Sequence, residues 1–298
     1  MSKPITAKEI ADLRARTGAG MMDCKKALEE AEGDVEKAIA VLRTKGITKA
    51  EKRAGRAASE GRIVAVTGDD GKSVALVEVN SETDFVSRND EFGALAQGLA
   101  VQVHQDAALD EVVHVAGEGK LLAQPYHADA SKTVDDVVKA ASAKTGENVV
   151  LRRYARFTTQ GALGTYVHFN HKVAALVEVE GGSGPAVDAL AKEIAEHVAA
   201  GVPRVPVAAN RAEVPASFVA SERAIFEAQA KESGKPEAIV AKMVDGRIAK
   251  LYGEIVLTEQ PWVRDDSQTI QQRVDAVSKS EGATLGVRRF VRFQMGEE

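Results

Sequence analysis

Few residues of this chain have the types and the spacing that a chemical step or a metal ion would need. His168 and His171 are three positions apart and, together with Asp84, offer the ligand types of a metal hydrolase. In a strand, however, residues three positions apart point to opposite faces of the sheet, and no third ligand lies near the two histidines in the sequence. We therefore expect no metal ion, and a metal hydrolase stays an alternative that metal analysis of the purified protein would settle.

Two other motifs fall short of what chemistry requires. Gly71-Lys72-Ser73 resembles the end of a phosphate-binding loop, but Val66 stands where that loop needs its first glycine, and Asp69-Asp70 would repel phosphate. The motif is more typical of a hairpin turn. Cys24, the only cysteine, is expected to be a small buried residue of a short helix, and a single cysteine excludes a disulfide within the chain. The sequence thus predicts neither an active site nor a cofactor.

Length and charge limit the kinds of partner that the chain can have. Its 298 residues exceed the usual size of a single core, so two or three domains are expected. With 39 Lys and Arg against 44 Asp and Glu, the net charge of -5 disfavours a nucleic acid or an anionic membrane as the main partner. No apolar run approaches the roughly 18 residues of a membrane span, and no signal peptide is recognisable. We expect a cytoplasmic protein that recognises a macromolecular partner locally.

The first part of the chain, residues 1–55, is expected to form a module of three short helices. Thr6 and Glu9 have the spacing of a capping box that opens the first helix. The second helix is expected over Asp23–Ala31. The third follows Gly33-Asp34, has the apolar spacing of a helix and is expected to stop at Gly46.

Two features of this region have more than one interpretation. Met21 and Met22, placed in the first loop, are either core residues or an apolar binding edge. Residues 45–62 carry basic side chains among alanine and glycine, but no aromatic residue that would stack on a base. A solvated linker is therefore favoured over an RNA-binding segment.

After the linker the sequence repeats itself. Lys72–Val79 recurs as Lys172–Val179, and Asn148–Phe157 matches Thr284–Phe293, where both copies are predicted strands that carry arginines. The repeat predicts two tandem α+β subdomains, residues 56–158 and 159–298. Each is expected to have an antiparallel sheet with helices on one side.

The neighbours of the repeated strand are also alike in the two copies. Each copy follows another predicted strand, over Arg62–Thr67 or Thr165–Phe169, and precedes an amphipathic helix. The second half also holds an insertion, residues 206–253. Within it, Ala220–Lys231 and Pro236–Tyr252 are expected to form a helical hairpin that packs upon itself or offers a face to a partner.

The repeat breaks at the loop that follows the apolar strand. The first copy has Asn80–Arg88 here, with Asp84 next to Phe85, whereas the second has only the turn Glu180–Pro185. Aromatic residues make up 4% of the chain, so a phenylalanine in such a loop is a candidate for insertion into another molecule. The alternative is that Phe85 folds back under its own loop. A residue needed only to close a subdomain should have a counterpart in the other copy, and the asymmetry therefore favours function.

Long segments of the chain resemble a known family. The run Leu13–Leu28, followed by Gly33-Asp34, closely resembles the amino-terminal module of bacterial elongation factor Ts, a three-helix fold of ubiquitin-associated type. The segment Glu78–Asn89 resembles the core loop of that family. Further matches extend the likeness to nearly the whole chain: Gly164–His168, His197–Ala200, Ser233–Arg247, Gly253-Glu254 and Gln260-Pro261.

The resemblance implies a guanine-nucleotide exchange factor for elongation factor Tu, a translation factor without catalytic chemistry of its own. It implies binding to the GDP-bound and the nucleotide-free partner, with no nucleotide site in this chain. The residues that would displace Mg2+ from the partner's nucleotide site are Thr83, Asp84, Phe85 and Val86. The helical hairpin would reach the other side of the partner or join two copies of the chain as a dimer.

Other contacts carried over from the family are Arg14, Met21 and Met22 in the module and His168 in the second half of the core. The sequence departs from the family in two places. Many members have a glycine-rich run after the histidine, where this chain has residues 169–172. Longer members also carry a helical module after the last strand, and we expect that contact to be missing here, where the sequence ends at Glu298.

The main rival from another functional class is an adaptor that binds RNA or a ubiquitin-like protein without exchange activity. The three-helix module, the basic linker and the arginine-bearing strands suggest it. Contacts with phosphates make binding fall steeply with salt, so the salt dependence of RNA binding would identify such an adaptor.

Overall fold

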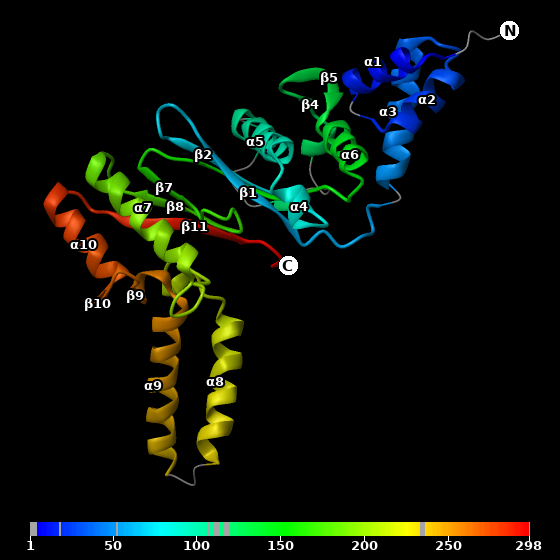
Figure 1. Cartoon of the computed structure of the whole chain (residues 1–298). Helices are drawn as coiled ribbons and strands as arrows, with labels where there is room; N and C mark the ends of the chain where they lie inside the picture. The colour runs from blue at the N-terminus through cyan, green and yellow to red at the C-terminus, as the bar shows by residue number, and fades with distance from the viewer. Residues whose placement is uncertain are drawn as a thin grey trace. The chain divides into compact units, whose positions relative to one another are not determined.

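A computed structural model of the chain describes residues 5–17, 19–51, 53–106, 108–109, 114–115, 120–232 and 236–297. Helices alternate with small antiparallel sheets, and a helical module begins the chain (Figure 1). The predicted α+β class with an N-terminal helical module is confirmed. Two compact units make up the structure: unit 1 holds Met1–Val66, Ala75–Arg156 and Gln294–Glu298, and unit 2 holds Thr67–Val74 and Phe157–Phe293.

The helical module consists of α1 (Ala7–Thr17), α2 (Met21–Glu30) and α3 (Val35–Glu51). The predicted capping box is present, because Thr6 Oγ1 accepts the Glu9 N–H at 3.2 Å and the Glu9 carboxylate accepts the Thr6 N–H at 2.8 Å. Apolar residues of the module meet in one small core: Leu13, Cys24, Ala27, Leu28, Ala31 and Ala38. Cys24 is therefore a small buried residue, as predicted.

The third helix is longer than its sequence suggests. α3 passes through Gly46 and continues to Glu51, so the prediction that Gly46 ends this helix is wrong. A Cβ atom at Gly46 would lie 3.2 Å from the Cβ atom of Ala143 on α6 (Val134–Thr145). The same two helices are joined by an ion pair of Arg43 with Asp136 at 2.7 Å. The glycine thus permits the close approach of α3 to α6, and its role is in packing.

Unit 1 contains a four-stranded sheet with the strand order β1-β2-β6-β3. The strands are β1 (Glu60–Thr67), β2 (Ser73–Ser81), β6 (Val150–Thr158) and β3 (His114–Val115). The sheet packs against α5 (Asp90–Gln105) and α6, while α4 (Asp84–Ser87) leads from β2 into α5. Before α6 lie η1 (Lys120–Ala123) and the hairpin of β4 (Pro125–Tyr126) with β5 (Asp129–Thr133).

The turn between β1 and β2 includes Gly71-Lys72-Ser73. It is closed by hydrogen bonds from Gly68 N to the Ser73 carbonyl at 2.8 Å and from Gly71 N to the Gly68 carbonyl at 2.9 Å. The prediction of a hairpin turn in place of a phosphate-binding loop is confirmed.

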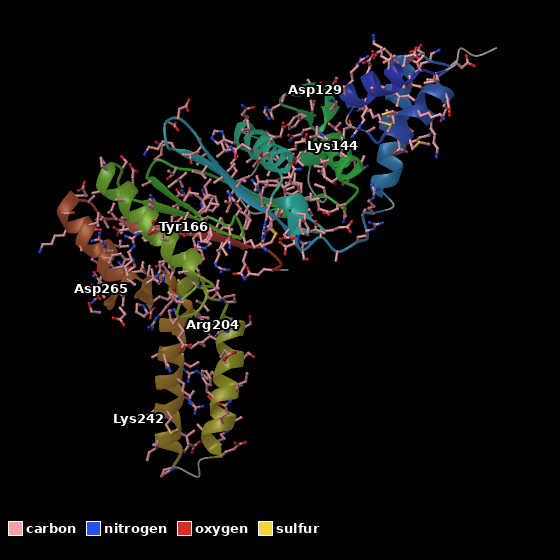
Figure 2. All side chains as sticks on the ribbon, viewed as in Figure 1. Asp129, Lys144, Tyr166, Arg204, Lys242 and Asp265 are labelled. Atoms are coloured by element: carbon pink, nitrogen blue, oxygen red, sulfur yellow. The ribbon has the colours of Figure 1, made fainter. Side chains whose placement is uncertain are left out.

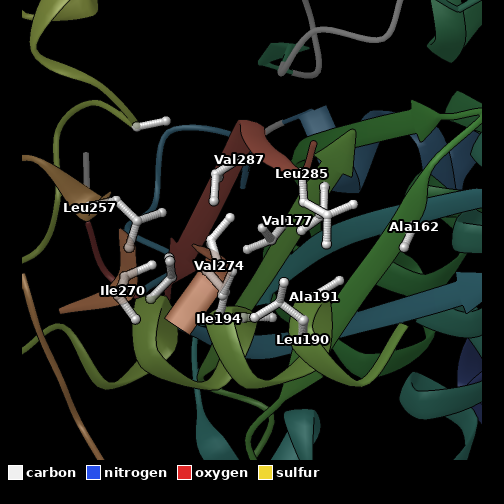
Figure 3. Close-up of a cluster of buried hydrophobic side chains, with 14 of the residues drawn as sticks. Ala162, Val177, Leu190, Ala191, Ile194, Leu257, Ile270, Val274, Leu285 and Val287 are labelled. Atoms are coloured by element: carbon white, nitrogen blue, oxygen red, sulfur yellow. The ribbon is translucent and has the colours of Figure 1, made fainter. Parts of the chain in front are cut away.

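Unit 2 contains a three-stranded sheet with the order β11-β8-β7. The strands are β7 (Ala162–Val167), β8 (Val173–Glu180) and β11 (Gly286–Gln294), and the sheet packs against α7 (Pro185–Ala200) and α10 (Ile270–Glu281). Figure 3 shows Val177, Ile194 and Val274 meeting in this core. At Gly164 a Cβ atom would lie 1.9 Å from the carbonyl oxygen of Ala191, so only glycine lets α7 come this close to β7.

The insertion in unit 2 forms the expected helical hairpin, α8 (Ala216–Lys231) and α9 (Glu237–Ile255), between the turns η2 (Arg211–Glu213) and η3 (Leu257–Glu259). The hairpin has a core of its own, in which Val240, Val244 and Ile248 of α9 are buried. An ion pair of Arg223 with Asp245 at 2.9 Å also joins the helices, which lie side by side in Figure 1. Residues 233–235 of the connection lie outside the described residues. The short strands β9 (Pro261–Trp262) and β10 (Asp265–Thr269) then lead to α10.

The two units also share polar details. α6 and α10 both begin with a capping box, at Thr133 and Thr269. Both helices end at a glycine in the left-handed conformation, Gly146 with φ 79° and Gly282 with φ 63°. The internal repeat therefore preserves helix starts and stops as well as apolar residues.

Each unit also buries a glutamate against an arginine of its neighbouring strand. In unit 1, Arg153 Nε on β6 donates to Glu78 Oε2 on β2 at 2.7 Å. In unit 2, Arg289 Nε on β11 donates to Glu178 Oε2 on β8 at the same distance. Both glutamates are 1% exposed. Two of the arginines that made these strands look like a nucleic-acid surface are therefore used inside the protein.

His197 on α7 is buried in unit 2 as a neutral ring. Its Nδ1 accepts a hydrogen bond from Val263 N at 3.1 Å, so the ring proton is on Nε2, which donates to Gln260 Oε1 at 2.9 Å. In unit 1, Gln102 on α5 has the corresponding role, because its Oε1 accepts from His127 N at 2.6 Å and its Nε2 donates to Gln124 Oε1 at 3.2 Å. Glutamine can thus make the contacts of this histidine.

We expect His197 to weaken the fold in mild acid. Burial lowers the pKa of His197 below its usual 6.5, and the hydrogen bond with Gln260 opposes this shift only in part. The unfolded chain therefore binds a proton more readily, and the free energy of unfolding falls as the pH drops below about 6.5 towards the lowered folded-state pKa. His197→Gln should remove this loss, as measured by urea unfolding between about pH 7 and pH 5. An equal slope of unfolding free energy against pH in the variant would contradict the assignment.

Candidate functional site

The loop that breaks the internal repeat forms a compact turn with one aromatic side chain in solvent. We call residues 82–88 the Phe85 turn. It is built around α4, a single helical turn between β2 and α5 (Figure 1). The Phe85 side chain is 85% exposed, so the interpretation in which Phe85 folds back under its own loop is wrong.

Three neighbours of Phe85 have contacts that keep the turn in shape. Thr83 is the N-cap of α4, and its Oγ1 accepts the Val86 N–H at 3.4 Å. Asp84 forms an ion pair with Arg88 at 3.0 Å. Val86 packs against the apolar core of unit 1. Of the four residues predicted to bind a partner, Phe85 alone is mostly exposed to solvent. The contacts of the other three also stabilise the turn that carries it.

The charged groups around Phe85 do not form a metal site among the described residues. No group of three or more His, Cys, Asp or Glu side chains among the residues that the structure describes could hold a metal ion. Asp84 is partly exposed and already faces a cation, Arg88. The turn therefore presents an exposed aromatic ring beside a partly exposed carboxylate that is paired with Arg88.

The second predicted core contact, His168, lies in the hairpin turn after β7. The assumption that His168 and His171 lie in a strand is wrong, because β7 ends at Val167 and His171 N donates to the His168 carbonyl at 2.8 Å within the turn. Tyr166 OH bonds His168 Nδ1 at 2.8 Å and orients the imidazole; Figure 2 labels this tyrosine. Phe169 packs on the His168 ring, with centroids 4.5 Å apart, and is itself 85% exposed.

Phe169 is an exposed aromatic residue that was not among the predicted site residues. A signal was available, since residues 169–172 stand where the resemblance implies a glycine-rich run in many members of the family. The position of Phe169 in a turn, beside a predicted contact residue, distinguishes it from the buried aromatic residues of the core.

The residues predicted as module contacts are on the surface of unit 1. Met21 and Met22 begin α2 and are 55% and 61% exposed, so the interpretation of these residues as core plugs is wrong. Arg14 is exposed on α1. Together with the Phe85 turn these residues belong to unit 1, whereas His168 belongs to unit 2.

Several of the basic residues that suggested RNA binding are engaged within their own units, among the residues that the structure describes. In the linker, Arg53 donates to the Ser142 carbonyl at 3.2 Å and Arg56 to the Glu82 carboxylate at 3.3 Å. In the arginine-bearing strands, Arg156 and Arg292 donate to carbonyls near the ends of α5 and α7, those of His104 and Ala199. These contacts leave fewer basic side chains available for phosphates, and the adaptor alternative loses support.

Unit 2 has a surface hollow of about 350 Å³, and none of the predicted site residues is among its lining residues. Thr159, Gly161, Glu178 and Arg288 are among its lining residues. Its buried carboxylate, Glu178, is already paired with Arg288 at 3.1 Å and with Arg289.

None of the helices in the described part of the chain combines the length and the apolar character needed to cross a membrane.

Comparison with known proteins adds a family to this geometry. The family model described as elongation factor TS matches residues 82–297. The chain is 42% identical to elongation factor Ts of Trichlorobacter lovleyi, over 98% of this chain and 93% of that protein. It is 44% identical to the Methylococcus capsulatus protein of the same name, over 98% and 92%, and 39% identical to that of Aquifex aeolicus, over 99% of each.

Proposed function

The chain belongs to the elongation factor Ts family, and on that basis we propose that it binds elongation factor Tu with GDP and promotes the release of GDP, so that GTP can bind. The observation that carries the proposal is the exposed Phe85 on a turn whose neighbouring residues hold it in place. In this role the chain works in the cytoplasm as a translation elongation factor. It performs no chemical step and has no nucleotide site of its own.

The energetics of such a factor require a broad interface in addition to Phe85. A nucleotide held at nanomolar affinity is worth about -12 kcal/mol, much of it through Mg2+ and the phosphate-binding loop of the partner. Burying one phenylalanine contributes ~1.5–3 kcal/mol. Phe85 can therefore trigger release, but other contacts must stabilise the complex. By linkage, this chain lowers the affinity of elongation factor Tu for GDP by the same ratio as GDP lowers the affinity of elongation factor Tu for this chain.

We assign those other contacts to the predicted residues described above. Arg14, Met21 and Met22 would contact the partner from the helical module, and His168 from the hairpin turn of unit 2. Thr83, Asp84 and Val86 would act with Phe85 in disturbing the Mg2+ and phosphate site. The α8–α9 hairpin would contact the partner or a second copy of this chain.

The direct test is the release of fluorescently labelled GDP from purified elongation factor Tu. We expect this chain to accelerate release at micromolar concentration or below, and to leave release unchanged when it is denatured beforehand. No acceleration by a folded chain would refute the proposed function.

The proposed displacement of Mg2+ makes a further prediction. If part of the effect comes from removing the ion, that part is already achieved when a chelator removes Mg2+. The fold acceleration of GDP release should therefore be large in millimolar Mg2+ and clearly smaller in excess EDTA. Equal acceleration under both conditions would place the action on the phosphate loop or the base pocket, and would remove Mg2+ displacement from the mechanism while leaving exchange intact.

A further inference from the structure

One carboxylate that is not part of the Phe85 turn, that of Glu147, accepts hydrogen bonds from the residues that begin the turn. Glu147 lies in the turn between α6 and β6, immediately after the left-handed Gly146. Its Oε2 accepts the N–H groups of Glu82 at 3.1 Å and Thr83 at 3.0 Å, and its Oε1 accepts the Thr83 hydroxyl at 2.6 Å. Three donors of the Phe85 turn thus converge on a single side chain, and hydrogen bonds to an ionised acceptor are the stronger kind.

The contact is reciprocal. Glu82 Oε1 accepts the N–H of Asn148 at 2.7 Å, so each of the two segments presents a carboxylate to the backbone of the other. The Asn148 side chain in turn donates to the Arg56 carbonyl at 2.8 Å. The start of the Phe85 turn is therefore joined to the α6–β6 turn by hydrogen bonds in both directions.

The hydrogen bonds of Glu147 reach Phe85 through a short path. The Thr83 hydroxyl that donates to Glu147 also accepts the Val86 N–H as the N-cap of α4. A helix of one turn is not stable alone, because nucleation costs more than one hydrogen bond returns. Glu147 thus orients the residue that starts the helix on which Phe85 is displayed.

The internal repeat provides a natural comparison. The turn after α10 has the same left-handed glycine, Gly282, but the residue that follows it is Ala283 where unit 1 has Glu147. Unit 2 also lacks a protruding turn after β8: a Cβ atom at Gly181 would lie 1.8 Å from the carbonyl oxygen of Thr284. The fold of the repeat therefore forms without the glutamate, and the glutamate occurs where there is a turn to hold.

We propose that Glu147 is a positioning residue for nucleotide exchange, which keeps the Phe85 turn in the conformation that enters the partner. This inference rests on the proposed function. Glu147 acts through Thr83 and α4, and its value for exchange is preorganisation, because a turn that is already ordered loses less entropy on binding.

The test combines the free chain with the exchange reaction. Glu147→Ala should speed amide hydrogen exchange at Glu82 and Thr83 in the free chain, with little change in the strands β2 and β6. At saturating chain it should lower the maximal rate of GDP release by about tenfold. The GDP release rate of Glu147→Gln should lie between those of the unmodified chain and Glu147→Ala, because a carboxamide has only one acceptor oxygen. The matched control is Asp265→Ala, which removes a carboxylate of unit 2 that accepts the Ser267 N–H at 3.2 Å, the Ser267 hydroxyl at 2.6 Å and a Gln268 side-chain N–H at 2.6 Å; it should leave release within about twofold of the unmodified chain.

A double variant separates positioning from general destabilisation. If Glu147 acts through Phe85, adding Glu147→Ala to Phe85→Ala should cost much less than Glu147→Ala costs alone. The inference would be overturned if the rate losses of the two substitutions multiply in the double variant. It would also be overturned if Glu147→Ala leaves amide exchange at Glu82 and Thr83 unchanged. Failure of the unmodified chain to release GDP would instead refute the proposed function, and the inference with it, before any variant is compared.

Discussion

Replacing Phe85 with alanine should slow the stimulated release of GDP by about tenfold or more, while the thermal midpoint of the free protein stays nearly unchanged. The reason is that Phe85 is 85% exposed, so its ring contributes little to folding. In the proposed complex its contacts would form only with the partner, and a tenfold loss of rate corresponds to about 1.4 kcal/mol of transition-state stabilisation. Stopped-flow release of labelled GDP and differential scanning calorimetry measure the two quantities.

Two neighbouring positions serve as controls for this prediction. Val86 follows Phe85 but packs into the core of unit 1, so Val86→Ala should lower the thermal midpoint. Phe169 is as exposed as Phe85 but lies in the hairpin turn of unit 2, and Phe169→Ala should slow release less. A large fall of the midpoint in Phe85→Ala, with release reduced only in proportion to the folded fraction, would make Phe85 a structural residue.

Features that depend on a few adjacent residues could be predicted from the sequence. The Thr6–Glu9 capping box and the hairpin turn at Gly71-Lys72-Ser73 are set by local hydrogen bonds and by glycine. The helical hairpin of α8 and α9 follows from the apolar spacing of each helix. The asymmetry of the repeat likewise marked the turn that carries Phe85.

Features that depend on residues distant in the sequence could not be predicted in this way. Gly46 does not end α3, because its role is set by Ala143 on another helix. The support of Phe85 by Glu147 and the burial of Glu78 against Arg153 arise only when separate strands and turns are brought together. The prediction that His168 lies in a strand is wrong for a different reason, because β7 ends at Val167 and the chain turns there.

The buried ion pairs predict the largest effect on stability. Arg153→Ala should destabilise the protein by about 3–5 kcal/mol, because it leaves the carboxylate of Glu78, 1% exposed, without the cation that pairs with it among the described residues. Arg153 also donates to the Gln294 carbonyl at 2.9 Å, so the substitution removes a second contact within unit 1. Unfolding in urea, followed by circular dichroism, measures the loss.

The matched substitution in unit 2, Arg289→Ala, should cost less. Glu178 would keep Arg288 at 3.1 Å and the hydroxyl of Thr159 at 2.7 Å, so its charge would stay partly compensated. If an unpaired buried charge is the cause of the larger loss in unit 1, adding Glu78→Gln to Arg153→Ala should recover part of the stability, because the variant then buries a neutral amide. Equal losses in the two units, or no recovery by Glu78→Gln, would show that the damage comes from lost packing of the arginine side chain and not from the charge that it leaves behind.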